Sequence, residues 1–113
     1  MSEQNCIFCK IANKEINSNL LLETEDYVAF NDINPQAPVH VLVIPKKHYS
    51  SLNDIDNPEF MGKLMLGAKE VAKKLNIDKG YRVVINTGSD AGQTVFHIHL
   101  HILGGRPLLW PPG

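Results

Sequence analysis

Three histidines alternate with aliphatic residues in one short stretch of this 113-residue chain: His97, His99 and His101. Alternation has a period of two residues, so an extended strand would place the three imidazoles on one face and the aliphatic side chains on the other. Residues two apart lie about 6.6 Å apart along a strand, so three rings could surround one small anion or one metal ion. The stretch 97–103 therefore predicts a strand with an aliphatic core face and a histidine face that forms a site.

The histidine face has three interpretations. Chance is one, although an exposed strand face rarely concentrates a titratable residue in this way. A three-histidine zinc site is the second, because His-x-His on a strand can present two ligands. Nucleophilic catalysis is the third, with one imidazole attacking phosphorus or carbon while its neighbours fix its tautomer and handle protons. The rest of the chain has to decide among them.

Composition excludes several classes of partner. Eleven basic and twelve acidic side chains give a net charge of −1, without the basic excess of a nucleic-acid or membrane-surface binder. No apolar run approaches the roughly 20 residues that span a bilayer, and the first residues lack the pattern of a signal peptide. We therefore expect a small-molecule ligand, no nucleic-acid or membrane partner, and a cytoplasmic location that leaves access to the nucleus open. The length predicts a single domain over 1–113, with 104–113 as an extended C-terminal tail.

Cys6 and Cys9 open a segment, up to Glu15, that could form one or two helical turns with both sulfurs on one side. In a reducing compartment, reduced thiols or metal ligands are favoured over a structural disulfide. A zinc tetrahedron would need two further ligands, and there is no second Cys-x-x-Cys to supply them. Histidines would have to complete the site, and a redox pair or two buried small residues stay open as alternatives.

The elements that must position these residues are predicted by apolar patterning. Strands are expected at 20–24, 27–30, 40–45 and 81–86, in addition to 97–103. Residues 40–45 are almost wholly apolar and end at Pro45, as expected of a central strand buried on both faces. Asn57 should cap a long helix that begins at Pro58, ends near Asn76 and lays one apolar face on the sheet.

A polar loop with two glycines, 87–94, leads directly into the histidine stretch. Its small residues would let backbone N–H groups approach an anion, and Asn86 and Thr94 could donate to phosphate oxygens. The loop lacks the lysine of a Walker motif and opens no helix. Joined to the histidines, it favours catalysis at a phosphate over a plain three-histidine zinc site. Asp32, just before a loop with two prolines, is expected to cap a turn on sequence alone.

The chain resembles the histidine-triad (HIT) family of nucleotide hydrolases and transferases, most of all its Hint branch. The family signature, His-φ-His-φ-His-φ-φ with φ apolar, is met by residues 97–103, and the resemblance covers Cys6 to Gly113. It implies an α+β fold with a five-stranded antiparallel sheet, one short helix and one long helix. It also implies a homodimer whose sheet continues over ten strands. Further matching segments are 30–33, 35–38, 44–48, 88–90, 92–93 and 110–113.

For the chemistry, the resemblance implies hydrolysis of the P–N bond of purine nucleoside 5′-phosphoramidates, which are AMP or GMP derivatives. His99 would attack the α-phosphorus and form a covalent nucleotidyl-histidine. His40, His97 and His101 would organise that face, and His101 would assist the leaving amine. Thr94 stands where animal relatives carry serine, which could alter the fit of the leaving group. The implied nucleotide contacts are Asp32 at the ribose, Ile33, Phe8 and Ile11 near the base, and Asn86, Gly92, Gln93, Thr94, His99 and His101 around the phosphate.

The resemblance also completes the metal site. In many microbial members two cysteines bind structural zinc with two histidines, here Cys6, Cys9, His48 and His97. Four protein ligands leave no open position for water, so the chemistry itself would need no metal. The apolar tail 107–112 is expected to reach toward the partner's site in the dimer.

Two alternative functions stay in view. One is a nucleotide-binding scaffold or interaction protein with incidental catalysis, since a fold does not imply a function. The other is another HIT-type nucleotidyl hydrolase or transferase, such as one that processes adenylyl sulfates. The complete set of four histidines and the intact polar loop favour catalysis.

Overall fold

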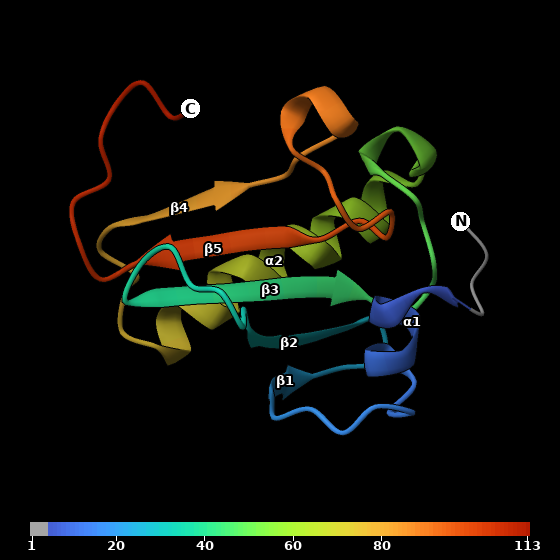
Figure 1. Ribbon diagram of the computed structural model, residues 1–113. Coiled ribbons are helices and arrows are strands. Elements are labelled where there is room, and N and C mark those ends of the chain that lie inside the picture. Colours follow the sequence, from blue (N-terminus) through green and yellow to red (C-terminus); the bar gives the residue numbers. More distant parts are fainter. Residues whose placement is uncertain (1–4) are drawn as a thin grey trace.

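A five-stranded antiparallel sheet organises the protein, which a computed structural model describes over residues 5–113 (Figure 1). Across the sheet the strands run in the order β1-β2-β3-β5-β4, and the two helices are the short α1 and the long α2. The α+β fold expected from the sequence is confirmed. The bounds are α1 Ile7–Ala12, β1 Leu20–Glu23, β2 Tyr27–Asn31, β3 Val39–Pro45, η2 Leu52–Asp54, α2 Pro58–Lys74, β4 Tyr81–Val84, η3 Ser89–Ala91 and β5 Leu100–Gly104.

β3 is the central strand and is buried on both faces, as its apolar sequence predicts. Val41 and Val43 belong to the core that α2 covers, whereas Leu42 and Ile44 belong to a second core beneath α1. Alternate residues of a strand point to opposite faces, so the two helices lie on opposite sides of the sheet. In Figure 1, α2 lies behind β3 and β5.

α2 begins as predicted. The Asn57 side chain accepts hydrogen bonds from the backbone N–H groups of Glu59 and Phe60, and Pro58 is the first helical residue. The helix ends at Lys74, two residues before the expected end. Its buried face, which includes Leu64, Gly67, Ala68, Val71 and Ala72, packs on the sheet. No helix of the described residues is long and apolar enough to cross a membrane.

The histidine stretch is only partly a strand, so the prediction of a strand over 97–103 is wrong at its beginning. β5 starts at Leu100, and its ladder with β3 ends at the pair of Val43 and Leu100. Before that point the chain turns away, because the Ile98 N–H donates to the carbonyl of Tyr49 at 2.7 Å instead of to β3. β4 pairs with β5 only as far as Val84, which lies opposite His101, so β4 ends there rather than at residue 86.

Two glycines of α2 provide a matched test of how tightly this helix packs. A Cβ at Gly67 would lie 2.9 Å from Cζ of the buried Tyr27 ring on β2, whereas a Cβ at Gly62 would meet nothing within 4 Å. Gly62→Ala should raise the free energy of unfolding by about 0.5–1 kcal/mol through helix propensity. Gly67→Ala should lower it, because the Tyr27 ring has to shift. Urea unfolding of both variants measures the difference, and equal stabilisation by the two substitutions would contradict this packing.

Candidate active site and metal centre

The face of the sheet beneath α1 carries a pocket of about 480 Å³. Its floor is a row of paired residues, in which His101 on β5 lies opposite Leu42 on β3, and Leu42 lies opposite Phe30 on β2. Phe8 and Ile11 of α1 form one wall. The pocket is therefore polar at its β5 end and apolar where it crosses β3 and β2.

The histidines of this site are covered rather than exposed. His97 is fully buried, His99 is 7% exposed and His101 is half-buried. Phe8 covers the first two, because its ring meets those of His97 and His99 edge-on with centroid distances of 6.0 and 5.0 Å. Desolvation lowers the pKa of His97 and that of His101 to about 4, and it also lowers the pKa of His99. At neutral pH each ring is uncharged and presents one N–H and one lone pair.

The tautomer of His99 follows from its backbone partner. Its Nδ1 lies 2.9 Å from the carbonyl oxygen of His97, which can only accept, so Nδ1 carries the proton. The lone pair is then on Nε2, which hydrogen-bonds no described residue. His99 also lines the pocket. The middle histidine therefore has an unprotonated nitrogen available for a ligand.

The tautomer of His101 is set through His40. The Gln36 N–H donates to His40 Nδ1 at 3.0 Å, so His40 carries its proton on Nε2. That Nε2–H lies 2.9 Å from His101 Nδ1, which must accept and leaves the His101 proton on Nε2. The rings of His99 and His101 meet with a centroid distance of 4.9 Å. Neighbouring rings therefore present opposite groups, a lone pair on His99 and an N–H on His101.

Asp32 caps a turn, as the sequence predicts, and its side chain also lines the pocket. Oδ1 accepts from the Asn34 N–H at 2.8 Å, which caps the turn after β2. Oδ2 lies 3.4 Å from His40 Nε2, and the side chain lines the pocket. Ile33 also lines the pocket although its side chain is completely exposed, so it stands at the mouth.

The polar loop reaches the pocket mainly through Thr94, which lines it. The backbone N–H groups of Gly92 and Gln93 donate to the carbonyls of Ser89 and Gly88, so both are engaged within the loop. The buried Gln93 side chain also works internally, accepting from the Gly88 N–H and donating to the carbonyls of Ser50 and Val95. Asn86, Gly92 and Gln93 are not among the residues that line the pocket. Gly92 and Gln93 shape the loop that presents Thr94.

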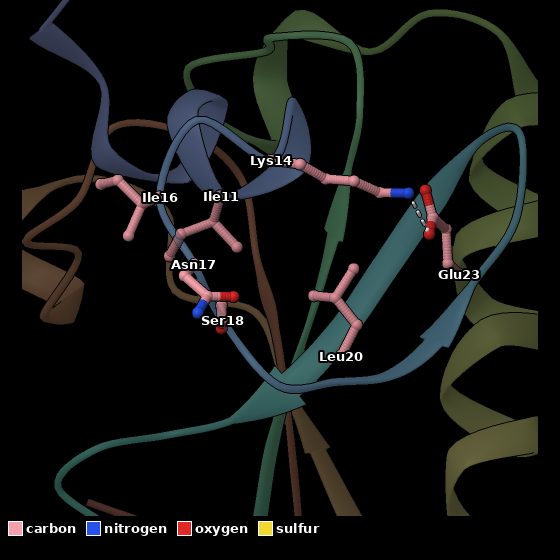
Figure 2. Close-up of a pocket in the computed structure, with 7 residues that line it drawn as sticks. All are labelled: Ile11, Lys14, Ile16, Asn17, Ser18, Leu20 and Glu23. Carbon is pink, nitrogen blue, oxygen red and sulfur yellow. Dashed lines mark ion pairs between the residues drawn. The ribbon is translucent and has the colours of Figure 1, made fainter.

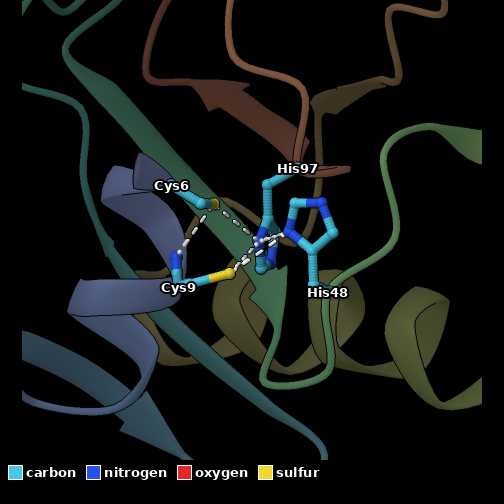
Figure 3. Close-up of side chains that lie close together, drawn as sticks. All are labelled: Cys6, Cys9, His48 and His97. Atoms are coloured by element: carbon cyan, nitrogen blue, oxygen red, sulfur yellow. Dashed lines mark hydrogen bonds between the residues drawn. The ribbon is translucent and has the colours of Figure 1, made fainter. Parts of the chain in front are cut away.

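A second cluster lies beside the pocket and consists of Cys6, Cys9, His48 and His97 (Figure 3). Their Sγ and Nδ1 atoms all lie within 4.8 Å of one another. His97 Nε2 donates to the Pro45 carbonyl at 2.8 Å, so its Nδ1 lone pair faces the other three ligand atoms. It lies 3.3 Å from Cys6 Sγ, 3.4 Å from Cys9 Sγ and 3.2 Å from His48 Nδ1.

These residues fit zinc. Zinc bonds of about 2.3 Å to sulfur and about 2.0 Å to nitrogen give tetrahedral edges of about 3.5 Å between sulfur and nitrogen and about 3.3 Å between two nitrogens. The observed S···N and N···N separations are slightly shorter than those edges. Two thiols and two imidazoles are also the donor set of many closed structural zinc sites. The cluster joins α1, the loop after β3 and the segment before β5.

Three contributions to the site are not predicted by the sequence. Two are backbone groups, the Gln36 N–H and the Pro45 carbonyl, and no residue type signals them. The third is the loop 16–18 after α1, which lines the pocket on the side away from the histidines. The sequence could have indicated this loop, because it follows directly after the segment that carries Phe8 and Ile11.

Comparisons with known proteins agree with this geometry. The HIT domain family matches residues 13–108. An uncharacterized HIT-like protein of Synechocystis sp. is 52% identical over 112 residues, covering 97% of this chain and 98% of that protein. A 14 kDa zinc-binding protein of Zea mays is 47% identical over 118 residues, covering 100% of this chain and 91% of that protein.

A solved structure extends the likeness to three dimensions. The HIT family hydrolase from Legionella pneumophila matches with a TM-score of 0.93 and 47% sequence identity, covering 96% of this chain and 100% of that one. The fold, the histidine stretch and a family match over most of the chain lead to one conclusion: this protein belongs to the HIT family, whose members bind nucleotides and are generally nucleotide hydrolases.

Proposed function

We propose that this protein hydrolyses the P–N bond of purine nucleoside 5′-phosphoramidates and that His99 is the nucleophile. The observation that carries the proposal is the hydrogen bond from His99 Nδ1 to the His97 carbonyl, because it leaves the Nε2 lone pair at the pocket. A neutral imidazole nitrogen held in one tautomer is the form that can attack phosphorus near neutral pH.

The reaction divides into two steps. His99 Nε2 bonds to the α-phosphorus as the P–N bond breaks, and a substrate nitrogen already protonated from solvent leaves as the neutral amine with the electron pair of that bond. Water then attacks the same phosphorus and gives up a proton to solvent as the P–Nε2 bond breaks, which releases a nucleoside monophosphate and returns the lone pair to Nε2. His101 assists as a hydrogen-bond donor to the reacting group. His101 does not give its own Nε2 proton to the leaving group. To do so it would have to carry a proton on Nδ1 as well, and that proton would meet the N–H of His40.

The rest of the pocket would hold the nucleotide. Asp32 would bind the ribose hydroxyls and Thr94 a phosphate oxygen; in support, both polar side chains line the pocket together with His99 and His101. Ile33, Phe8 and Ile11 supply the apolar surface for a purine base. In this assignment Gly92 and Gln93 hold the loop, and Asn86 stays a predicted donor to the phosphate.

We also propose that Cys6, Cys9, His48 and His97 hold one structural zinc ion. When bound, zinc supplies a crosslink among three segments and folding free energy, and His99 needs no metal. The zinc-binding relative from Zea mays and the geometry of the cluster support this assignment. The cytoplasmic location stays a prediction.

A homodimer would complete the site. β4 is an edge strand that pairs only with β5 among residues 5–113, so a second copy could pair there and continue the sheet over ten strands. Arg82 of β4 donates to the Leu109 carbonyl at 2.9 Å and holds the tail near this edge. Leu109 and Trp110 are 77% and 81% exposed, which leaves apolar surface for a partner.

His99→Ala should lower kcat for adenosine 5′-phosphoramidate by at least about 1000-fold, because the nucleophile is lost. AMP binding measured by calorimetry should persist, since Asp32 and Thr94 remain. His101→Ala, which removes only a donor, should keep measurable turnover. An alkaline quench of a slow substrate followed by peptide mass spectrometry should find the nucleotide on His99. An adduct on another histidine would falsify the assignment.

Metal analysis of protein purified without added zinc should find one zinc per chain. Cys9→Ser should lose the metal and lower the thermal unfolding temperature, because structural zinc contributes folding free energy. His40→Asn is the matched control, since it removes a buried histidine outside the cluster and should keep the metal. Absence of metal from fresh, reduced protein would rule out the zinc assignment.

Sedimentation at micromolar concentration should give the mass of a dimer. Deletion of residues 107–113 should change substrate preference more than it changes this mass, because β4 rather than the tail carries the strand pairing. A monomer at that concentration would refute the shared site.

A further inference from the structure

The loop 16–18, between α1 and β1, separates two cavities. On one side is the pocket that holds the histidines. On the other is a cavity of about 280 Å³, which Lys14, Leu20 and Glu23 also line (Figure 2). Asn17 and Ser18 line both cavities, so their side chains stand at the junction.

Strand pairing places this junction at the far end of the pocket from the histidines. The floor is the row of paired residues His101, Leu42 and Phe30, and the next residue of this row is Leu20 on β1. Three steps between neighbouring strands of about 4.8 Å cover roughly 14 Å. Leu20 lines the second cavity together with Asn17 and Ser18. A ligand with phosphorus at His99 and an apolar ring over Leu42 and Phe30 therefore points its far edge at this junction.

The polar groups at that end differ in how available they are to bind a ligand. Lys14 and Glu23 form an ion pair at 2.8 Å, and Lys46 lies 2.9 Å from the same carboxylate, so these charges are already paired. The side chains of Asn17 and Ser18 hydrogen-bond no other residue of the described chain, 5–113. They are the polar side chains available to the far edge of a ligand in this pocket.

We propose that Asn17, assisted by Ser18, determines specificity by hydrogen-bonding the edge of the purine base, an inference that rests on the proposed function. A carboxamide carries both an acceptor and a donor, and it can turn over. In one orientation it accepts from the adenine amino group and donates to N1. In the other it donates to guanine O6 and accepts from N1–H. The second cavity leaves room for the exocyclic group, so the wild-type protein accepts both purines.

The variant Asn17→Asp should change the affinities for adenine and guanine nucleotides differently. A carboxylate can only accept, so it loses the bond to adenine N1, whereas guanine offers N1–H and its 2-amino group as two donors. The ratio of GMP affinity to AMP affinity should rise about tenfold relative to wild type, as expected for one hydrogen bond to a charged group. Asn19→Asp is the matched control. It makes the same charge change two residues away on an exposed side chain that lines neither cavity, and it should leave the ratio unchanged.

Calorimetric titration of the full-length wild-type and variant proteins with AMP and GMP measures this ratio without any turnover. Asn17→Ala should weaken the binding of both nucleotides. In turnover of the two phosphoramidates it should raise KM more than it lowers kcat. An unchanged ratio in Asn17→Asp, or an equal shift in Asn19→Asp, overturns the role of Asn17 while leaving the phosphoramidase proposal intact. Wild-type protein that binds both nucleotides but hydrolyses neither phosphoramidate refutes the proposed function alone, and absence of all binding refutes both.

Discussion

His97 is the residue on which both halves of the site depend, because three of its polar groups have separate partners. Nε2 donates to the Pro45 carbonyl, and this bond turns Nδ1 toward the sulfurs of Cys6 and Cys9. Its backbone carbonyl accepts from Nδ1 of His99. The side chain therefore belongs to the proposed metal centre, while the main chain sets the tautomer of the proposed nucleophile, His99. A displacement of His97 would disturb both.

Burial and hydrogen bonds to the backbone together set the charge and the tautomer of the histidines. Desolvation keeps the rings neutral, as the lowered pKa values of His99 and His101 indicate, but a neutral imidazole can still carry its proton on either nitrogen. A carbonyl that can only accept fixes His99, and an N–H that can only donate fixes His40 and, through it, His101. Main-chain groups do not titrate, so this arrangement of lone pair and N–H is independent of pH until a ring itself is protonated.

The sequence predicted the elements better than the contacts between them. The central strand, the capped start of α2 and the first two strands follow from local patterns and agree with the structure within a residue. The strand over 97–103 was overestimated, because periodicity cannot reveal that the Ile98 N–H bonds to Tyr49 across the fold. The grouping of the two cysteines with His48 and His97 came from the family resemblance, since spacing alone does not say which distant histidines meet. The roles of Gln36 and Pro45 could not be predicted, because any residue supplies a main-chain carbonyl and all but proline an N–H.

α1 shows how the proposed metal centre would affect the pocket without taking part in the chemistry. A helix of six residues is too short to be stable alone, so its position depends on tertiary contacts. Cys6 and Cys9 lie at its start, and Phe8 and Ile11, on the same helix, form a wall of the pocket. Both cysteines lie before residue 13, where the family match begins, whereas His48 and His97 lie within it, so the matched domain supplies the two histidines and α1 adds the two sulfurs. A metal bound there would fix the position of the pocket wall relative to His97. It would affect the reaction by positioning these residues, not by bonding to the substrate.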